Sequence, residues 1–232
     1  MLTELIFILD RSGSMGGLES DTIGGFNTML KKQQTEKGEC RITTILFDNE
    51  YEVLHDRIDI KAVSPITQRE YNVRGSTALL DAIGKTINKI GNVQKNTAKE
   101  YRADKVLVVI TTDGMENASR EFGYDKIKAM IESQKKKYNW EFIFLGANID
   151  AVAVANRFGI DKNRAVNFHN DSAGINLNYG VLSQTVSAYR AAPPECAAPI
   201  PDNWSKDIKD DYANRGKQGK QKWWQKVLSR DN

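Results

Sequence analysis

The chain has 232 residues, of which 40% are hydrophobic, and its formal net charge is +3. This length accommodates one large domain with a sizeable core, or one domain with an appendage. The net charge is too small to indicate a partner, and it neither implies nor excludes nucleic acid or a membrane surface.

The sequence also excludes several classes of protein. No stretch approaches the apolar length that crosses a bilayer. The N-terminus has neither the basic flank nor the small-residue cleavage site of a secretory signal. Cys40 and Cys196 lie far apart and suggest no disulfide framework. We therefore expect a cytoplasmic protein with reduced thiols.

Strands and helices alternate in the predicted order. Continuous apolar runs predict strands that are buried on both faces, at residues 5–9, 42–47, 106–110 and 142–145. Helical spacing predicts helices at residues 18–35, 78–95, 124–138, 149–158 and 172–190, with a last short strand at 164–168. This alternation predicts an α/β protein, a Rossmann-like three-layer α/β/α sandwich around a mostly parallel sheet.

One segment departs from the alternation. Residues 45–56, ILFDNEYEVLHD, contain two strand-like runs joined through Asp48 and Asn49, a favourable pair for a tight turn. They predict a hairpin whose second run, residues 51–55, is an antiparallel strand. Its mixture of polar and apolar residues suits the edge of a sheet.

Gly24 and Gly25 lie inside the first predicted helix, where glycine is unfavourable. We interpret this pair as permitting a close approach of the helix to the sheet. A kink in the helix is the alternative.

The composition changes after Arg190. Residues 191–201, AAPPECAAPIP, hold most of the prolines and predict an extended linker. The polar tail at 202–232 has Trp204, Trp223 and Trp224 as its main anchors. We therefore predict a domain at residues 1–190, followed by a linker and a basic tail at 191–232.

Three oxygen-bearing side chains follow the first predicted strand. Asp10, Ser12 and Ser14 alternate with other residues in DRSGSM, and Gly13 lets the loop curl so that they converge. Carboxylate and hydroxyl oxygens suit magnesium, manganese or calcium rather than zinc. The alternative is a serine-rich turn whose aspartate bonds to backbone amides.

Two later segments place further oxygens near this loop. Thr77 precedes the helix predicted from residue 78, and its alternative role is a helix cap. Asp113 ends another buried run and is followed by Gly114. Because ligands of open α/β sheets bind at the carboxyl ends of the strands, we expect Asp113 to face Asp10 across that crevice.

Together these segments resemble the metal-ion-dependent adhesion site of von Willebrand factor type A (vWA) domains. Asp10, Ser12 and Ser14 match the D-x-S-x-S pattern of that family, Thr77 matches its separate threonine, and Asp113 matches its later aspartate in a T-D-G setting. The resemblance covers about residues 1–190, and in particular it extends to short intracellular vWA domains of bacteria and phages. It implies a sheet with the hairpin strand at one edge, the first strand in the centre, and the Asp113 strand beside it.

The resemblance also implies a function. In the family, the serine hydroxyls bind the ion directly and the aspartates act partly through water. A cation held mainly by neutral donors attracts a further anionic oxygen, which a Glu or Asp of a partner protein supplies. We therefore expect a non-enzymatic, magnesium-dependent interaction module, with manganese or calcium as alternative ions. Relatives work with AAA+ ATPases or in stress and phage-defence gene sets, and the resemblance allows such partners, although nothing in these residues chooses among them.

A magnesium-dependent phosphoesterase is the first alternative. Such an enzyme needs a nucleophile or an activated water together with a base. The residue two positions after Asp10 is Ser12 rather than a second carboxylate. His55 falls on the predicted edge strand and His169 beyond the last strand, so neither is an obvious catalytic base.

The tail suggests two further alternatives. Residues 214–230 hold six basic residues and two adjacent tryptophans, which could bind nucleic acid or an anionic membrane. We favour a short helix at 220–228 that docks its tryptophans on the domain or on a partner. An acid of the tail could also occupy the metal position in cis, the candidates being Asp207, Asp210 and Asp211, although a hydrated surface is the simpler explanation.

Overall fold

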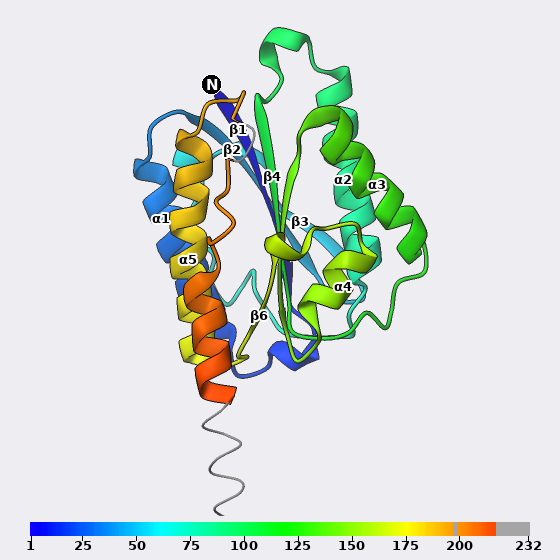
Figure 1. Cartoon of the computed structure of the whole chain (residues 1–232), viewed down its shortest axis with the longest axis vertical. Helices are drawn as coiled ribbons and strands as arrows, with labels where there is room; N and C mark the ends of the chain where they lie inside the picture. Colours follow the sequence, from blue (N-terminus) through cyan, green and yellow to red (C-terminus); the bar gives the residue numbers. More distant parts are fainter. Residues whose placement is uncertain (197–198, 217–232) are drawn as a thin grey trace, which may run out of the picture.

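A sheet of six strands in the order β3-β2-β1-β4-β5-β6 forms the centre of the computed structural model, which describes residues 1–196 and 199–216. Helices cover both faces of this sheet (Figure 1). The strands are β1 (Leu2–Asp10), β2 (Glu39–Phe47), β3 (Tyr51–Asp59), β4 (Lys105–Thr112), β5 (Glu141–Ala147) and β6 (Ala165–Phe168). The helices are α1 (Glu19–Thr35), α2 (Leu79–Asn96), α3 (Tyr124–Tyr138), α4 (Ala151–Arg157) and α5 (Ser172–Ala191).

The arrangement confirms the predicted α/β/α sandwich. Each strand and helix predicted within residues 1–190 coincides with one of these elements. All neighbouring strands pair in parallel except β2 and β3, which are antiparallel, and β3 lies at the edge as predicted. Phe47 pairs with Tyr51, so the hairpin loop consists of residues 48–50.

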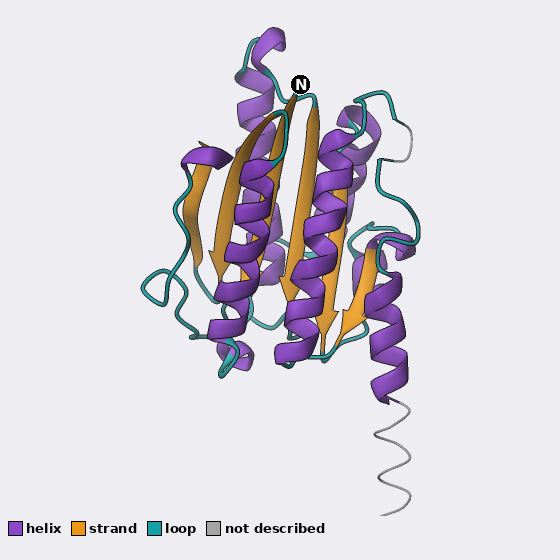
Figure 2. Ribbon diagram, turned by 90° about the vertical axis from the view of Figure 1, so that its left-hand side faces the viewer, coloured by secondary structure: helices purple, strands orange, loops and turns teal. Residues whose placement is uncertain are grey.

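The continuous apolar run of β1 is explained by burial on both faces. Leu5, Phe7 and Leu9 pack into the layer that lies under α1 and α5, the two helices in front of the sheet in Figure 2. Ile6 and Ile8 pack into the opposite layer, under α2, α3 and α4. Full burial of such side chains stabilises a fold by about 1.5–3 kcal/mol each. The central strands therefore fix the positions at which the loops at their ends begin.

Gly25 of α1 serves the packing of α1 on α5 rather than an approach to the sheet, so the interpretation of the glycine pair was wrong. A Cβ added to Gly25 would lie only 2.2 Å from Cδ2 of Tyr179 on α5. A Cβ added to Gly24 would meet nothing within 4 Å. Gly25 thus lets α1 and α5 pack closely, because the ring of Tyr179 occupies the space of the missing side chain.

The chain beyond α5 returns to the domain. Ile200, Trp204 and Ile208 are buried in the layer formed by α1 and α5. The indole Nε1 of Trp204 donates a hydrogen bond to the Asn163 carbonyl at 2.7 Å, so its predicted role as an anchor is confirmed. Residues 206–216 are helical. The predicted helix at 220–228, with Trp223 and Trp224, lies outside the described residues.

Membrane spans were sought among the helices of residues 1–196 and 199–216. None of these helices has both the length and the apolar character needed to cross a bilayer.

The packing of α1 on α5 predicts opposite effects for two neighbouring substitutions. Gly25→Ala should lower the free energy of unfolding by about 1–3 kcal/mol, because the new methyl group overlaps Tyr179. Gly24→Ala is the matched control, and it should raise that free energy by about 0.5–1 kcal/mol because alanine favours the helix. Urea denaturation followed by circular dichroism measures both. Equal stability of the two variants would contradict this description of the interface.

Candidate metal centre

The candidate site lies where β1 and β4 end side by side. These strands are parallel and adjacent in the centre of the sheet, with Leu9 paired to Thr111. Asp10 is the last residue of β1, and Asp113 directly follows β4. The predicted order of strands is thereby confirmed, and both carboxylates belong to the edge of the sheet at which α/β proteins bind ligands.

Asp10 is buried and held in place by several hydrogen bonds. Its Oδ1 accepts from the Ser12 amide at 2.7 Å, and its Oδ2 accepts from Oγ1 of Thr112 at 2.6 Å. The Tyr71 hydroxyl donates to the Asp10 carbonyl at 2.5 Å. Burial raises the pKa of the Asp10 carboxyl, and the hydrogen bonds from Ser12 and Thr112 offset only part of that rise. A nearby cation would favour the ionised form.

Ser12, Ser14 and Asp113 are joined to one another. The two serine hydroxyl oxygens lie 3.2 Å apart, and Ser14 donates to Oδ1 of Asp113 at 2.5 Å. The other carboxylate oxygen of Asp113 accepts from Nδ2 of Asn170 at 2.8 Å. Burial raises the pKa of Asp113 too, against the hydrogen bonds from Ser14 and Asn170. The structure therefore brings these three predicted residues into one small cluster.

The hydroxyl of Thr77 lies near Gly114, as that of Ser14 does. A Cβ at Gly114 would be 3.4 Å from Oγ of Ser14 and 3.5 Å from Oγ1 of Thr77, so both hydroxyls face the space beside this glycine. The Thr77 amide donates to Oδ1 of Asn117 at 2.9 Å. Helix α2 begins after Thr77, with Ala78 as its N-cap residue. The alternative role of Thr77 as a helix cap is therefore wrong.

The donor set fits a small, hard divalent cation. The five predicted residues offer three neutral hydroxyls and two carboxylates, all of them oxygen donors. Within the described part of the chain, no group of three or more His, Cys, Asp or Glu side chains could hold a metal ion. The candidate site thus differs from zinc sites and from carboxylate-rich calcium loops, and it depends on its hydroxyls.

An ion-pair cluster around the buried carboxylate of Asp48, which we call the Asp48 clamp, joins three loops around the site. It consists of Asp48, Arg11 and Arg74, and the Nε atoms of both arginines lie 2.9 Å from Oδ2 of Asp48. The Arg74 amide also donates to the Arg11 carbonyl, and the Ala78 amide donates to the Asp48 carbonyl. The clamp therefore ties the loop of Ser12 and Ser14 to the hairpin and to the segment that carries Thr77.

The pKa of Asp48 reflects this role. Burial on its own would raise the pKa, but hydrogen bonds from Arg74, the Glu50 amide and Arg11 outweigh it and hold the pKa below the usual carboxyl range. Asp48 therefore stabilises the fold at neutral pH, and that contribution is lost as the pH falls through its lowered pKa.

Several supporting residues were missed by the sequence analysis. Thr112 and Asn170 orient the two carboxylates, and Asp48 was assigned only to a turn. Thr112 carried a weak signal, because it precedes Asp113 in the same polar segment. Asn170 and Asp48 carried none, since their partners lie 57 and 37 residues away in the chain.

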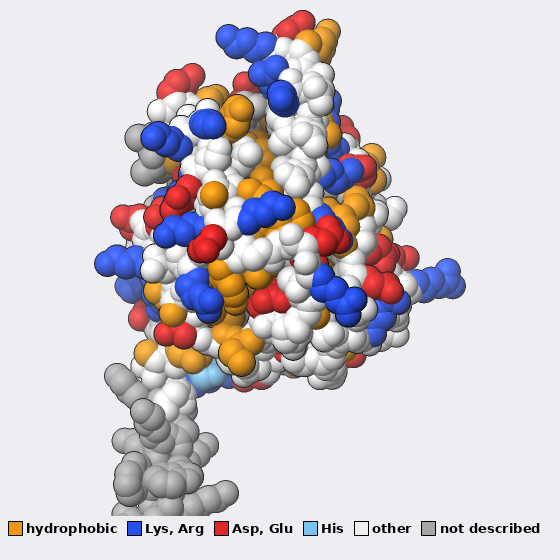
Figure 3. Space-filling view, turned by 90° about the vertical axis from the view of Figure 1, so that its right-hand side faces the viewer, with side chains coloured by type: hydrophobic (Ala, Val, Ile, Leu, Met, Phe, Trp, Pro, Cys, Tyr) orange, Lys and Arg blue, Asp and Glu red, His pale blue; other side chains and the backbone are white. Residues whose placement is uncertain are grey.

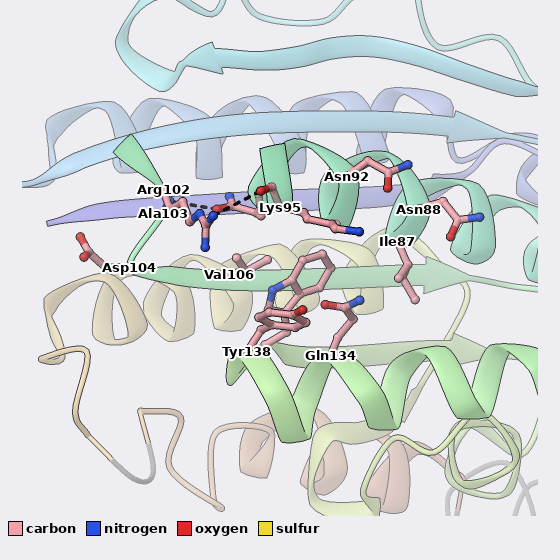
Figure 4. Close-up of a pocket in the computed structure, with 13 residues that line it drawn as sticks. Ile87, Asn88, Asn92, Lys95, Arg102, Ala103, Asp104, Val106, Gln134 and Tyr138 are labelled. Carbon is pink, nitrogen blue, oxygen red and sulfur yellow. Dashed lines mark hydrogen bonds between the residues drawn. The ribbon is translucent and has the colours of Figure 1, made fainter. Parts of the chain in front are cut away.

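A cavity of about 310 Å³ lies at the other end of the sheet (Figure 4). It is formed between α2 and α3, where β4 begins, and its lining includes Asn88, Arg102, Gln134 and Tyr138. The candidate metal centre lies at the ends of β1 and β4, so this cavity is separate from it.

Solved structures identify the fold. A von Willebrand factor type A protein from Catenulispora acidiphila matches with a TM-score of 0.55 at 13% identity, over 80% of this chain and 42% of that one. The vWF domain of the type V pili tip protein Mfa5 from Porphyromonas gingivalis matches with a TM-score of 0.54 at 14% identity, over 82% of this chain and 97% of that one. The chain has the fold of a vWA domain.

A third structure with the vWA fold contains a metal. Manganese-loaded TRAP protein from Plasmodium vivax matches with a TM-score of 0.54 at 19% identity, over 75% of this chain and 71% of that chain. No protein-family model matches the sequence, and no curated protein matches it either. The present chain spans less than half of the Catenulispora protein, and identities this low establish the vWA fold alone.

The Asp48 clamp predicts the effect of removing its charge. Asp48→Asn should lower the free energy of unfolding by about 2–3 kcal/mol, because the buried Arg11 loses a charged partner. Glu50→Gln changes the same charge at a largely exposed side chain and should cost less than about 1 kcal/mol. Urea denaturation at neutral and acidic pH measures both.

Measurements at several pH values distinguish the stabilisation due to the charge of Asp48 from that due to the size and shape of its side chain. The wild type should lose the contribution of Asp48 on acidification, and Asp48→Asn should lack that part of the acid dependence. The same acid-dependent loss in both proteins would contradict the assignment.

Proposed function

We propose that this chain is a protein-interaction module that binds an acidic residue of a partner through a divalent cation. Asp10, Ser12, Ser14, Thr77 and Asp113 would hold the ion, with magnesium as the expected ion and manganese or calcium as alternatives. The observation that carries the proposal is the gathering of these hydroxyls with two buried carboxylates whose pKa values are raised. A cation at this point offsets the cost of burying two negative charges.

The five side chains would leave room for a further ligand. Three of them are uncharged hydroxyls, so only Asp10 and Asp113 would offset the charge of the ion. An octahedral ion held by five side-chain donors would keep a coordination position open to an anionic oxygen from outside the chain. Thr112 and Asn170 keep the two carboxylates in fixed orientations. A Glu or Asp of a partner is the ligand that such a surface favours.

The descriptions of two structures with the same fold support a metal-dependent interaction module. TRAP was crystallised with manganese, and Mfa5 is a pili tip protein. For the present chain we carry over only the class of site, a metal-dependent interaction surface. A cytoplasmic location and a partner such as an AAA+ ATPase or a stress- or phage-related complex remain predictions from the sequence.

The positions of the histidines favour binding over phosphoester hydrolysis. His55 lies on the edge strand β3, where its Nδ1 is 3.0 Å from Oγ1 of Thr44. His169 stacks on Tyr212 with ring centroids 4.7 Å apart. Both rings are thus engaged elsewhere than at Asp10, and a phosphoesterase of this kind needs a base beside its metal.

The face over α2, α3 and α4 bears on the nucleic-acid alternative. Acidic and basic side chains are interspersed on this face (Figure 3). Nucleic-acid binding favours a basic patch or stripe instead. The basic residues from 217 onward belong to the part of the chain outside the described residues.

Metal-dependent partner binding is the first test. Protein captured from native cell extract on the full chain should be retained in magnesium and released by EDTA. Ser14→Ala should weaken that retention at least about tenfold, as expected for loss of a metal ligand. Ser64→Ala, at an exposed serine of another loop, is the matched control and should bind normally. Equal retention in magnesium and in EDTA would contradict the proposal.

A phosphatase assay tests the alternative. With p-nitrophenyl phosphate and either magnesium or manganese, we expect the wild type to show no more turnover than Asp10→Ala. Metal-dependent turnover that disappears in Asp10→Ala would replace the binding proposal with a catalytic one.

A further inference from the structure

A polar groove adjoins the candidate metal centre on the side of Thr77. It has a volume of about 480 Å³ and lies between the hairpin loop, α2 and the loop after β4. We call it the Arg120 groove and define it by five of its lining residues, namely Asn49, Ser76, Lys85, Asn117 and Arg120. Ser76 precedes Thr77, and Asn117 accepts a hydrogen bond from the Thr77 amide. The groove therefore begins beside the predicted metal ligand.

Hydrogen bonds to two carboxylates fix the wall of the groove. The Asp81 carboxylate accepts from the amides of Arg120, Glu121 and Phe122 at 2.9 to 3.0 Å. The Glu116 carboxylate accepts from the Leu80 amide of α2 and from the hydroxyl of Ser119. Both carboxylates are occupied by these hydrogen bonds, which fix the conformation of the loop after β4. A ligand would therefore meet a preformed surface, which lowers the entropic cost of binding.

Among the described residues, Arg120 gives the groove a positive charge that no ion pair neutralises. Lys85 and Glu121 neutralise each other at 2.7 Å. The side chain of Arg120 is exposed, and within the described ranges no ion pair or hydrogen bond joins its guanidinium to another residue. The fixed backbone of Arg120 thus presents a free guanidinium, the group best suited to binding a carboxylate through paired hydrogen bonds.

We propose that the Arg120 groove binds a second acidic side chain of the partner, a few residues along the chain from the one that reaches the metal. This inference rests on the proposed function, because it takes the first acid to be the ligand of the cation. The partner segment then carries two acids, one for the ion and one for Arg120. Exposed ion pairs contribute little by themselves, so the second acid adds selectivity and a modest gain in affinity.

Two series of synthetic peptides test this inference on the full chain. All peptides are capped, equal in length and built from glycine and serine. One series carries a single glutamate, and the other carries a second glutamate placed at each later position in turn. With magnesium, the best two-glutamate peptide should bind about fivefold more tightly than the single-glutamate peptide, as the upper range for an exposed ion pair predicts.

Two variants assign that gain to Arg120. Arg120→Glu and Arg120→Gln should abolish it and leave binding of the single-glutamate peptide within about twofold of the wild type, since salt screens the distant charge. Lys136→Glu is the matched control, because it reverses an exposed charge on the last turn of α3 and should keep the gain. Circular dichroism checks that each variant is folded.

The outcomes distinguish the two proposals. If every two-glutamate peptide binds no better than the single-glutamate peptide, or if the Arg120 variants keep the gain, the role of the groove is wrong. Magnesium-dependent binding of the single-glutamate peptide would then still support the proposed function. If neither series binds in magnesium, both proposals are overturned.

Discussion

The parallel pairing of β1 with β4 determines where the two acidic residues of the candidate site lie. The two strands end side by side at the same edge of the sheet. Asp10 at the end of β1 and Asp113 directly after β4 therefore occupy neighbouring positions at that edge. Both side chains are almost fully buried. Two buried carboxylates are costly unless hydrogen bonds or a cation compensate them. The surrounding residues supply hydrogen bonds, and the raised pKa values indicate that these bonds compensate only part of the cost.

Further polar side chains at this edge of the sheet connect the loops around the candidate site. Asp48 binds two arginines and thereby joins three loops. Asp81 and Glu116 fasten the loop after β4 to the start of α2. The two apolar layers stabilise the sheet itself, whereas these groups stabilise the loops at the ends of the strands. Their effect is to preorganise a surface, which is what a site for a metal ion and a partner carboxylate requires.

The sequence predicted the fold well because the central strands are buried on both faces. Such strands produce the uninterrupted apolar runs from which β1, β2, β4 and β5 were placed. The five candidate ligands could be named from the sequence because three lie within one short motif and two lie beside recognisable elements, and their role as metal ligands stays a prediction. Asn170 could not be named, because its bond to Asp113 depends on how the sheet brings β4 and β6 to the same edge.

Two further features show the limit of local patterns. The contact between Gly25 and Tyr179 joins residues of the first and last labelled helices, so a glycine in α1 gave no indication of its partner. At the end of the proline-rich segment and just beyond it, Ile200, Trp204 and Ile208 recur at intervals of four residues. This spacing indicates a buried face that the sequence analysis did not use. Both cases involve tertiary contacts that composition does not encode.

Calorimetric titration of the purified full chain with magnesium, and then with manganese, tests the central claim most directly. The account predicts saturable binding of a single ion per chain. A chain that takes up neither ion, while circular dichroism shows it to be folded, would contradict the account.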